Sequence, residues 1–168
     1  MSATIRPGRA ADLAAILEIY NHYVAHTVVT FDLAPATMDS RRDWIDGFDD
    51  DRHPLFVLED GGRLLGYAYA GTLRTRPAYD RSVETTIYLA PDATGAGHGR
   101  RLYGHLLTHL EGTDVHRAYG GITDPNPASV ALHEALGFRQ VGRFSECGRK
   151  FDQWWDVLWL ERSFPLES

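Results

Sequence analysis

The chain has 168 residues, a length typical of one domain that folds without disulfide or metal cross-links. Hydrophobic residues make up 43% of it and charged residues 24%, which is the balance of an ordinary globular protein. The formal net charge is −6 with no long block of like charge. This argues against a nucleic-acid-binding surface, because such a surface usually has a basic face.

Cysteine usage and hydropathy indicate the compartment. Cys147 is the only cysteine, so no internal disulfide can form, and a single thiol suits a reducing compartment. The N-terminal residues lack the apolar core of a signal peptide, and no apolar run approaches the roughly 20 residues of a membrane span. We therefore expect a cytosolic protein with no membrane partner.

The first third of the chain predicts one strand and two helices. Residues 4–6 are a short strand, and apolar residues at helical spacing predict an amphipathic helix from about Arg9 to His26. A shorter helix is expected from Asp39 to Phe48, with Asp39 or Ser40 as its N-cap.

A hairpin and a longer strand follow. Gly61 and Gly62 predict the turn between strands at 55–58 and 64–69. Residues 74–81 form a polar loop, and the next strand covers residues 83–89 before a proline at position 91 ends it.

The second half alternates strands with helices. A glycine-rich turn at 94–99 leads directly into a helix whose leucines stand four residues apart, and Gly137 ends a later helix at 129–136. The remaining strands are expected at 118–123, 138–144 and 154–160. The whole chain, 1–168, is thus predicted to be one α/β (α+β mixed) domain, with a mixed sheet of about six to seven strands and helices on both faces.

The turn from Gly95 to Gly99 is the most informative stretch. A helix N-terminus presents unpaired backbone N–H groups and partial positive charge, and glycines let phosphate oxygens approach them. The alternative is a flexible turn without a ligand. No Walker A run exists, and the dinucleotide fingerprint requires a third glycine where this chain has Arg100.

Two blocks of the sequence resemble the GNAT superfamily of N-acetyltransferases. The strand at 84–89, the glycine turn and the following helix resemble motif A, although Thr94 replaces the usual Gln or Arg. The block from Asn126 through Ser129 and His133 to Gly137–Phe138 resembles motif B. Together the two blocks are far more specific than either alone, and they imply the GNAT fold.

The resemblance narrows to the phosphinothricin N-acetyltransferase family. It extends over nearly the whole chain and is densest between Arg74 and Asp156, where it includes the segments 78–80, 132–138 and 148–157. Members of that family acetylate phosphinothricin, methionine sulfoximine or methionine sulfone. The resemblance therefore implies direct transfer of acetyl from acetyl-CoA to the α-amino group of a small acceptor, within a ternary complex and without a metal.

The resemblance also assigns residues to the cofactor. The strand before the turn would contact pantetheine and the acetyl carbonyl, the turn would hold the pyrophosphate, and a motif B residue would contact the cofactor arm. By position these residues are Ile87, Tyr88 and Leu89, then Gly95, Ala96, Gly97, His98, Gly99 and Arg100, and finally Asn126.

Catalysis needs a group that removes a proton from the acceptor amine, because most amino groups are protonated at neutral pH. Glu84 stands at the position of the family's proposed catalytic carboxylate, and the alternative is an exposed strand glutamate. His133 matches the family's active-site histidine and could orient substrate, act as a second base or protonate the thiolate; the alternative is a capped helix histidine.

The loop before Glu84 carries the expected acceptor site. Arg74, Arg76 and Tyr79 match positions that the family uses to bind the acid groups of the acceptor, and guanidinium groups suit such groups. The alternative is a solvated basic loop.

Other constellations are weaker. The histidine pairs 22/26 and 105/109 stand four apart on helices, but no His-Glu-x-x-His motif or cysteine cluster accompanies them, so no metal is expected. Cys147 lacks a local triad. The tryptophans at 154, 155 and 159 are interpreted as strand core or as a dimer contact, and a homodimer is expected from the family.

Two other functions stay open beside a small-molecule N-acetyltransferase. One is a protein or peptide acetyltransferase, which an acidic chain with an arginine-bearing acceptor loop fits poorly. The other is a non-catalytic module that binds coenzyme A, against which the presence of both Glu84 and His133 argues.

Overall fold

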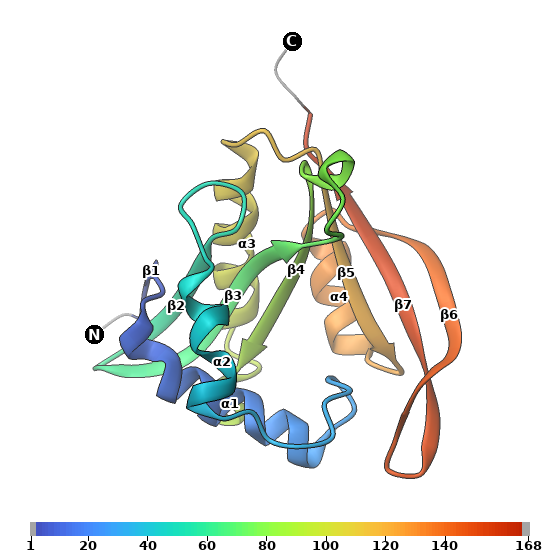
Figure 1. The fold of residues 1–168 in the computed structure, drawn as a ribbon, viewed down its shortest axis with the longest axis horizontal. Helices are drawn as coiled ribbons and strands as arrows, with labels where there is room; N and C mark the ends of the chain where they lie inside the picture. Colours follow the sequence, from blue (N-terminus) through green and yellow to red (C-terminus); the bar gives the residue numbers. More distant parts are fainter. Residues whose placement is uncertain (1–2, 166–168) are drawn as a thin grey trace.

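A seven-stranded sheet forms the centre of the molecule, as the computed structural model of residues 3–165 shows (Figure 1). All neighbouring strands are antiparallel except β4 and β5, which are parallel. The mixed sheet confirms the predicted fold class. Across the sheet the strands are β1 (Thr4–Pro7), β2 (Leu55–Asp60), β3 (Arg63–Thr72), β4 (Ser82–Leu89), β5 (Arg117–Asp124), β7 (Gln153–Ser163) and β6 (Arg139–Lys150).

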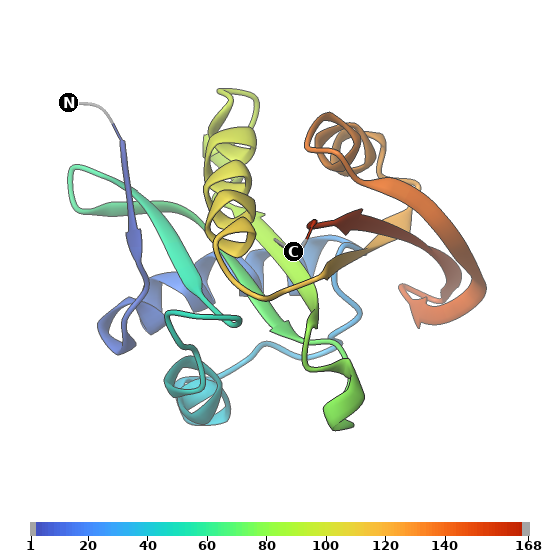
Figure 2. The ribbon, with the colours of Figure 1, turned by 90° about the horizontal axis from the view of Figure 1, so that it is seen from above.

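Helices cover both faces of the sheet (Figure 2). One face carries α1 (Leu13–His26) and α2 (Met38–Asp46), and the other carries α3 (His98–Glu111) and α4 (Pro127–Ala135). Each face has its own hydrophobic core, because each helix turns one apolar stripe to the sheet. Short 3₁₀ turns at Ala10–Asp12, Pro77–Tyr79 and Pro91–Ala93 complete the described elements.

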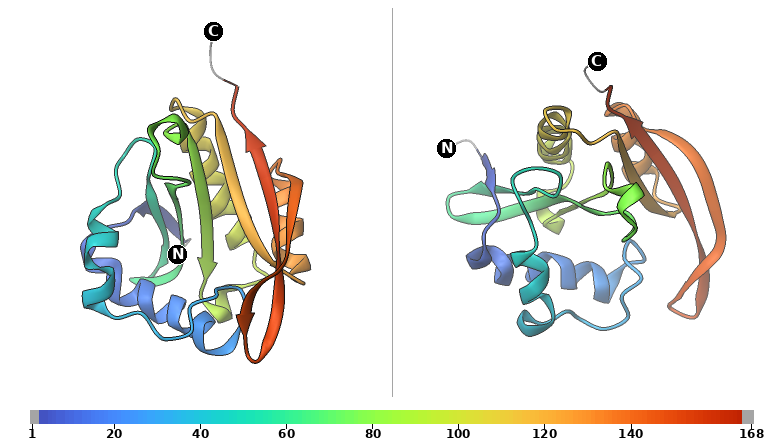
Figure 3. Two further views of the ribbon diagram at one scale, coloured as in Figure 1. Left: turned by 45° about the vertical axis from the view of Figure 1, so that its right-hand side comes forward. Right: turned by 45° about the horizontal axis from the view of Figure 1, so that its top comes forward.

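The two parallel strands, β4 and β5, diverge soon after they begin. Their register covers Ser82 with Arg117, Val83 with Ala118 and Glu84 with Tyr119 only. Figure 3 shows β4 and β5 side by side at their starts and diverging toward their ends. Since β5 turns to pair with β7 along its length, the second half of β4 has no strand partner on that side. Glu84 therefore stands at the point where the sheet opens.

Some element boundaries differ from the predicted ones. The N-cap of α2 is Thr37, not Asp39 or Ser40: its side chain accepts a bond from the Ser40 N–H at 3.2 Å, and the Ser40 hydroxyl reaches back to the Thr37 N–H at 2.9 Å. β6 runs to Lys150, well beyond the predicted residue 144. The prediction ended the strand too early because two register shifts in β6 interrupt the alternating sequence pattern.

No helix among residues 3–165 is both long enough and apolar enough to cross a bilayer.

Candidate active site

Glu84 lines a cavity of about 290 Å³ on the α1 and α2 face of the sheet. Residues from six parts of the chain form its walls: α1, the loop that follows α1, α2, β3, β4 and one residue of β5. The polar and aromatic lining consists of Tyr20, Thr30, Asp32, Arg41, Trp44, Tyr67, Tyr69, Glu84, Thr86 and Tyr88, and Gly121 contributes from β5.

The environment of Glu84 changes its acidity. Burial raises the pKa of the Glu84 carboxyl above its ordinary value, and the charge of Arg74 partly offsets this effect. A carboxylate with a raised pKa is a better proton acceptor near neutral pH than an exposed one. The raised pKa is the property that the expected role of Glu84 as a general base requires.

A charged and aromatic cluster on the wall of this cavity was not predicted from the sequence. The Tyr20 hydroxyl donates to Asp32 Oδ2 at 2.5 Å, and Arg41 Nη2 donates to the same oxygen at 3.1 Å. The Arg41 guanidinium lies 5.2 Å from the centroid of Tyr20 and 5.8 Å from that of Trp44. These residues come from α1, a loop and α2, and the spacing of Arg41 and Trp44 by one helical turn is the only local signal.

The predicted acceptor residues lie together in a neighbouring hollow. Arg74, Arg76 and Tyr79 line an open depression of about 300 Å³ with Thr75. None of them lines the cavity of Glu84, but the charge of Arg74 lowers the pKa of the Glu84 carboxyl and so partly offsets the effect of burial.

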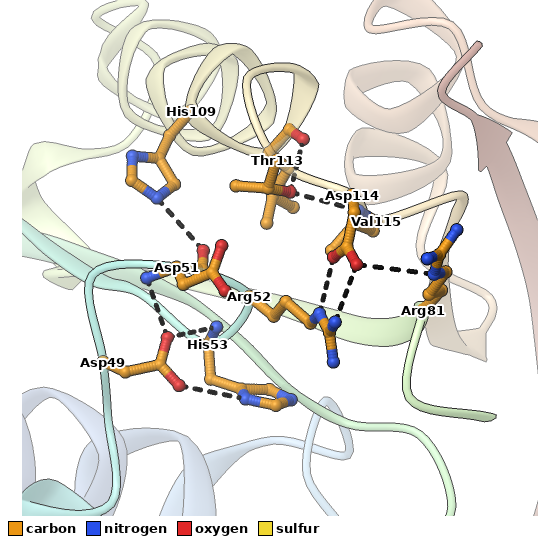
Figure 4. Close-up of polar contacts among 10 residues, drawn as sticks. Asp49, Asp51, Arg52, His53, Arg81, His109, Thr113, Asp114 and Val115 are labelled. Atoms are coloured by element: carbon orange, nitrogen blue, oxygen red, sulfur yellow. Dashed lines mark hydrogen bonds and ion pairs between the residues drawn. The ribbon is translucent and has the colours of Figure 1, made fainter. Parts of the chain in front are cut away.

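Ion pairs anchor the end of the loop that carries these arginines (Figure 4). The Asp114 carboxylate accepts two bonds from Arg52, at 2.6 and 2.7 Å, and lies 3.4 Å from Arg81 Nε. The Arg52 hydrogen bonds lower the pKa of Asp114. The main chain of Arg81 also accepts from the His116 N–H at 2.8 Å. The loop thus enters β4, which begins at Ser82, from a fixed position.

His133 lies on the opposite face of the sheet from Glu84. The His133 side chain is 4% exposed. Its Nδ1 donates to the Ser129 carbonyl at 2.8 Å. Because the neutral ring carries one proton, Nε2 is then an acceptor, and it accepts from the Tyr103 hydroxyl at 3.1 Å. Tyr103 in turn contacts Thr85 Oγ1 at 2.7 Å. Burial lowers the pKa of His133, which favours the neutral ring. Neighbouring strand residues point to opposite faces, so Thr85 faces this network while Glu84 faces the cavity.

The glycine turn presents open backbone at the start of α3. Gly95 and Gly97 have φ values of 79° and 78°, and an added Cβ would meet nothing within 4 Å at either position. Gly97 is the N-cap of α3, and no side chain caps the helix. The first N–H groups of α3 are therefore free for a ligand, and Ala96, His98 and Arg100 flank them.

Gly99 has a different role from the other two glycines. It is buried, and a Cβ there would touch Leu132 and Leu89 at 3.5 Å. Its position lets α3 approach the end of β4 and the side of α4 closely.

The remaining predicted cofactor residues border the opening between β4 and β5. Ile87, Tyr88 and Leu89 lie on the half of β4 that pairs with β3 but has no partner on the β5 side, and the Leu89 carbonyl accepts from the Tyr23 hydroxyl at 2.7 Å. The side chain of Tyr88 points into the Glu84 cavity, where burial raises its pKa. Asn126 caps α4 by accepting from the Ser129 N–H at 3.2 Å, which leaves its amide NH₂ for a ligand.

The histidine pairs are packed among aromatic groups. The rings of His22 and His26 lie 4.9 Å apart, and His105 and His109 contact Phe56 edge-on. Within residues 3–165, no group of three or more His, Cys, Asp or Glu side chains is placed to hold a metal ion.

Comparison with known proteins identifies the family. The acetyltransferase (GNAT) domain matches residues 5–159. The chain belongs to the GNAT acetyltransferases. It is 47% identical over 161 residues to a phosphinothricin N-acetyltransferase of Streptomyces coelicolor, with 94% of each chain covered. It is 34% identical to an L-methionine sulfoximine/L-methionine sulfone acetyltransferase of Salmonella typhimurium, with 94% of this chain and 92% of the relative covered.

A solved structure agrees with this assignment. A GNAT superfamily phosphinothricin acetyltransferase from Sinorhizobium meliloti in complex with acetyl-CoA superposes with a TM-score of 0.92 at 34% identity, covering 98% of this chain and 89% of that one. The present chain is therefore an acetyl-CoA-dependent N-acetyltransferase. Its open glycine turn, uncapped helix and parted strands fit a cofactor that carries a pyrophosphate and a long amide-containing arm.

Proposed function

We propose that this enzyme acetylates the α-amino group of a small amino acid that carries a second acidic or strongly polar tetrahedral group, of the phosphinothricin, methionine sulfoximine or methionine sulfone type. The observation that carries the proposal is the pairing of two hollows of opposite character. A partly desolvated carboxylate, Glu84, lies in an aromatic cavity, and two arginines lie in the hollow beside it.

The charges orient such an acceptor. The cavity of Glu84 is lined by two carboxylates, Asp32 and Glu84, and one guanidinium, Arg41, and its aromatic rings also favour a cation. The neighbouring hollow offers the guanidinium groups of Arg74 and Arg76. An α-amino acid would place its ammonium toward Glu84 and its acid groups toward the arginines. The names of the relatives support this class of acceptor.

In the proposed mechanism Glu84 removes a proton from the acceptor ammonium, directly or through one water. The neutral nitrogen then attacks the thioester carbonyl carbon and forms the nitrogen–carbon bond. The carbon–sulfur bond breaks, and the leaving thiolate takes up the second proton, which the nitrogen gives up as it becomes the amide nitrogen. Glu84 returns the first proton to solvent. Ile87, Tyr88 and Leu89 would hold the acetyl group and the pantetheine arm through backbone groups on the side of β4 that lacks a strand partner. Gly95, Ala96, Gly97, His98, Gly99 and Arg100 would hold the pyrophosphate, and Asn126 the cofactor arm.

We assign His133 a positioning role. Both of its ring nitrogens are engaged, by Ser129 and by Tyr103, and the ring lies so close to β5 that a Cβ at Gly120 would stand 2.7 Å from Nε2. Through Tyr103 it fixes Thr85, the residue that follows the last pair of β4 and β5. A direct proton transfer by His133 would require Nε2 to leave Tyr103.

The experiment that tests the acceptor class is a thiol-release assay with acetyl-CoA across a panel of amines. We expect phosphinothricin, methionine sulfoximine or methionine sulfone to give the highest kcat/KM. A higher value for spermidine, an aminoglycoside or a histone-tail peptide would reject the acceptor class and leave the acetyltransferase intact. Tight binding of acetyl-CoA without turnover of any amine would favour a non-catalytic module.

We also propose that the enzyme is a homodimer and works in a reducing compartment, the cytosol. The edge strand β6, the turn after it and the start of β7 expose Val141, Phe144, Phe151 and Trp154, each more than 40% accessible, which is an apolar surface that suits a second copy. Cys147 is an exposed free thiol, which fits a reducing compartment. Light scattering at micromolar concentration should give the mass of two chains, and a monomer would reject the dimer.

A further inference from the structure

Lys150 is the only lysine in the chain, against 16 arginines, and it is buried. It is 4% exposed at the end of β6, and its Nζ donates to the Thr30 carbonyl at 2.8 Å. The Phe151 ring lies 5.2 Å from the same nitrogen. Burial lowers the pKa of Lys150, and the charge of Asp32 partly offsets this effect. A buried ammonium needs such partners, because its desolvation is costly.

The hairpin that carries Lys150 packs on the loop between α1 and α2. Figures 1 and 3 show the tip of β6 and β7 beside this loop. The Phe31 ring fills the space that a side chain at Gly148 would occupy, so the loop and the hairpin contact each other closely. The Trp155 indole N–H donates to the Lys150 carbonyl at 2.9 Å and fixes the hairpin end.

The turn of this hairpin has a strained backbone. Phe151 and Asp152 have φ values of 52° and 58°, in the left-handed region that favours glycine and asparagine. Strain of this kind persists where the surroundings hold it in place, and it is frequent near functional sites. Here it turns the chain immediately after Lys150.

The loop segment held by Lys150 is a wall of the Glu84 cavity. Val29, Thr30 and Asp32 all line that cavity. The Thr30 hydroxyl lies 2.9 Å from the Tyr20 hydroxyl, which donates to Asp32. Hydrogen bonds thus hold this wall on two sides. Tyr20 connects it to α1, and the ammonium of Lys150 connects it to the β6–β7 hairpin.

We propose that Lys150 is a positioning residue for the acceptor: its ammonium holds residues 29–32 in the shape that the acceptor requires. The inference rests on the proposed role of the Glu84 cavity as the acceptor site. An arginine would not serve equally well, because a planar guanidinium would leave more of its five N–H donors without a partner than an ammonium leaves of its three, and the structure shows one carbonyl acceptor here.

Steady-state kinetics of Lys150→Met test the proposal. The acceptor KM should rise about 10-fold or more, since a displaced wall costs the acceptor its orientation, while the acetyl-CoA KM should stay within about 2-fold. The matched control is Arg149→Ala, which alters the neighbouring exposed residue and removes only its pair with Asp152. The control should behave as wild type.

A second measurement does not depend on the folding of that variant. Wild-type enzyme labelled with ¹³Cε-lysine should give a single lysine signal, displaced from the position of an exposed lysine and moved again by a saturating acceptor. In Gly148→Ala, where the added methyl group displaces Phe31, the signal should shift toward the exposed position and the acceptor KM should rise.

The outcomes separate this inference from the acceptor proposal. If an amino acid of the proposed class is turned over but Lys150→Met has the kinetics of Arg149→Ala, or the labelled lysine does not respond to acceptor, Lys150 has no positioning role. If no amine of that class is turned over by wild type, the proposed function fails instead, and the labelled lysine still reports whether the best acceptor in the panel engages this wall.

Discussion

The glycine turn at the start of α3, the proposed cofactor site, and the cavity around Glu84, part of the proposed acceptor site, are built in opposite ways. The turn is contiguous in sequence, exposed, and offers main-chain N–H groups with open space above Gly95 and Gly97. The cavity draws side chains from six parts of the chain and is aromatic and partly desolvated. The turn offers a ligand its backbone because side chains are absent there, whereas the cavity offers a ligand the side chains that line it.

This difference decides how each site can be damaged. A backbone site loses its ligand when atoms are added, because an added side chain occupies the place of the phosphate. A side-chain site loses function when a charge or hydroxyl is removed or moved. Substitutions in the two sites should therefore separate cofactor binding from acceptor chemistry.

The largest effect is expected at the cavity. Glu84→Gln removes the proton acceptor but keeps the shape of the side chain, so kcat should fall by about 10² to 10⁴-fold while the acetyl-CoA KM changes little. Because burial raises the pKa of Glu84, wild-type activity should rise with pH through a value above that of an ordinary glutamate, and the variant should lack this limb. A pH series of kcat measures both. A variant within about 2-fold of wild type at neutral pH would remove Glu84 from the mechanism.

The next effect is expected at the turn. Gly97→Glu places a side chain and a negative charge where the pyrophosphate should lie, so acetyl-CoA affinity measured by calorimetry should fall about 100-fold or more. The matched control is Gly62→Glu in the turn between β2 and β3. Gly62 also has a positive φ, 84°, and open space around it, so both variants carry similar backbone strain and the same added charge. Equal affinities in the two variants would show that the turn does not hold the cofactor.

The same contrast explains what could be predicted from the sequence. The order of all eleven main elements follows from apolar periodicity and from glycine and proline signals, and the turn is visible because its residues are consecutive. Arg41, Asp32 and Tyr20 could not be found in this way. They come from separate elements, and each alone is an ordinary surface residue type; only the path of the chain brings them together.

His133 shows a second limit. Its position in motif B predicts a place in the active site, whereas the direction in which a helix side chain points relative to the sheet cannot be read from the sequence. The packing of α4 against β5 decides this, and it places the imidazole on Tyr103, away from the cavity of Glu84.

A smaller effect is expected in the arginine hollow. Arg76→Ala should raise the acceptor KM about 10-fold and leave the acetyl-CoA KM nearly unchanged, because a bound acid group would lose one of two guanidinium partners. Arg139→Ala, which loses an exposed pair with Glu161, serves as the control and should leave both constants unchanged. An equal rise in both Michaelis constants for Arg76→Ala would place this arginine outside the acceptor site.

The smallest effect concerns stability and distinguishes a functional carboxylate from a structural one. Burial raises the pKa of Glu84 in the folded state, so the folded protein binds this proton more tightly than the unfolded chain does. The associated stability is fully present below the unfolded pKa and is lost as pH rises through the folded one.

At neutral pH the charged Glu84 therefore opposes folding, and Glu84→Gln should raise Tm while it lowers kcat. The gain should shrink toward zero as pH falls and Glu84 becomes protonated, and the same exchange at exposed Glu134 is the matched control. Thermal unfolding followed by circular dichroism across this pH range measures the difference. A Tm of Glu84→Gln below that of wild type at neutral pH would mean that the ionised carboxylate has stabilising partners in the fold, and that its position serves structure rather than the acceptor.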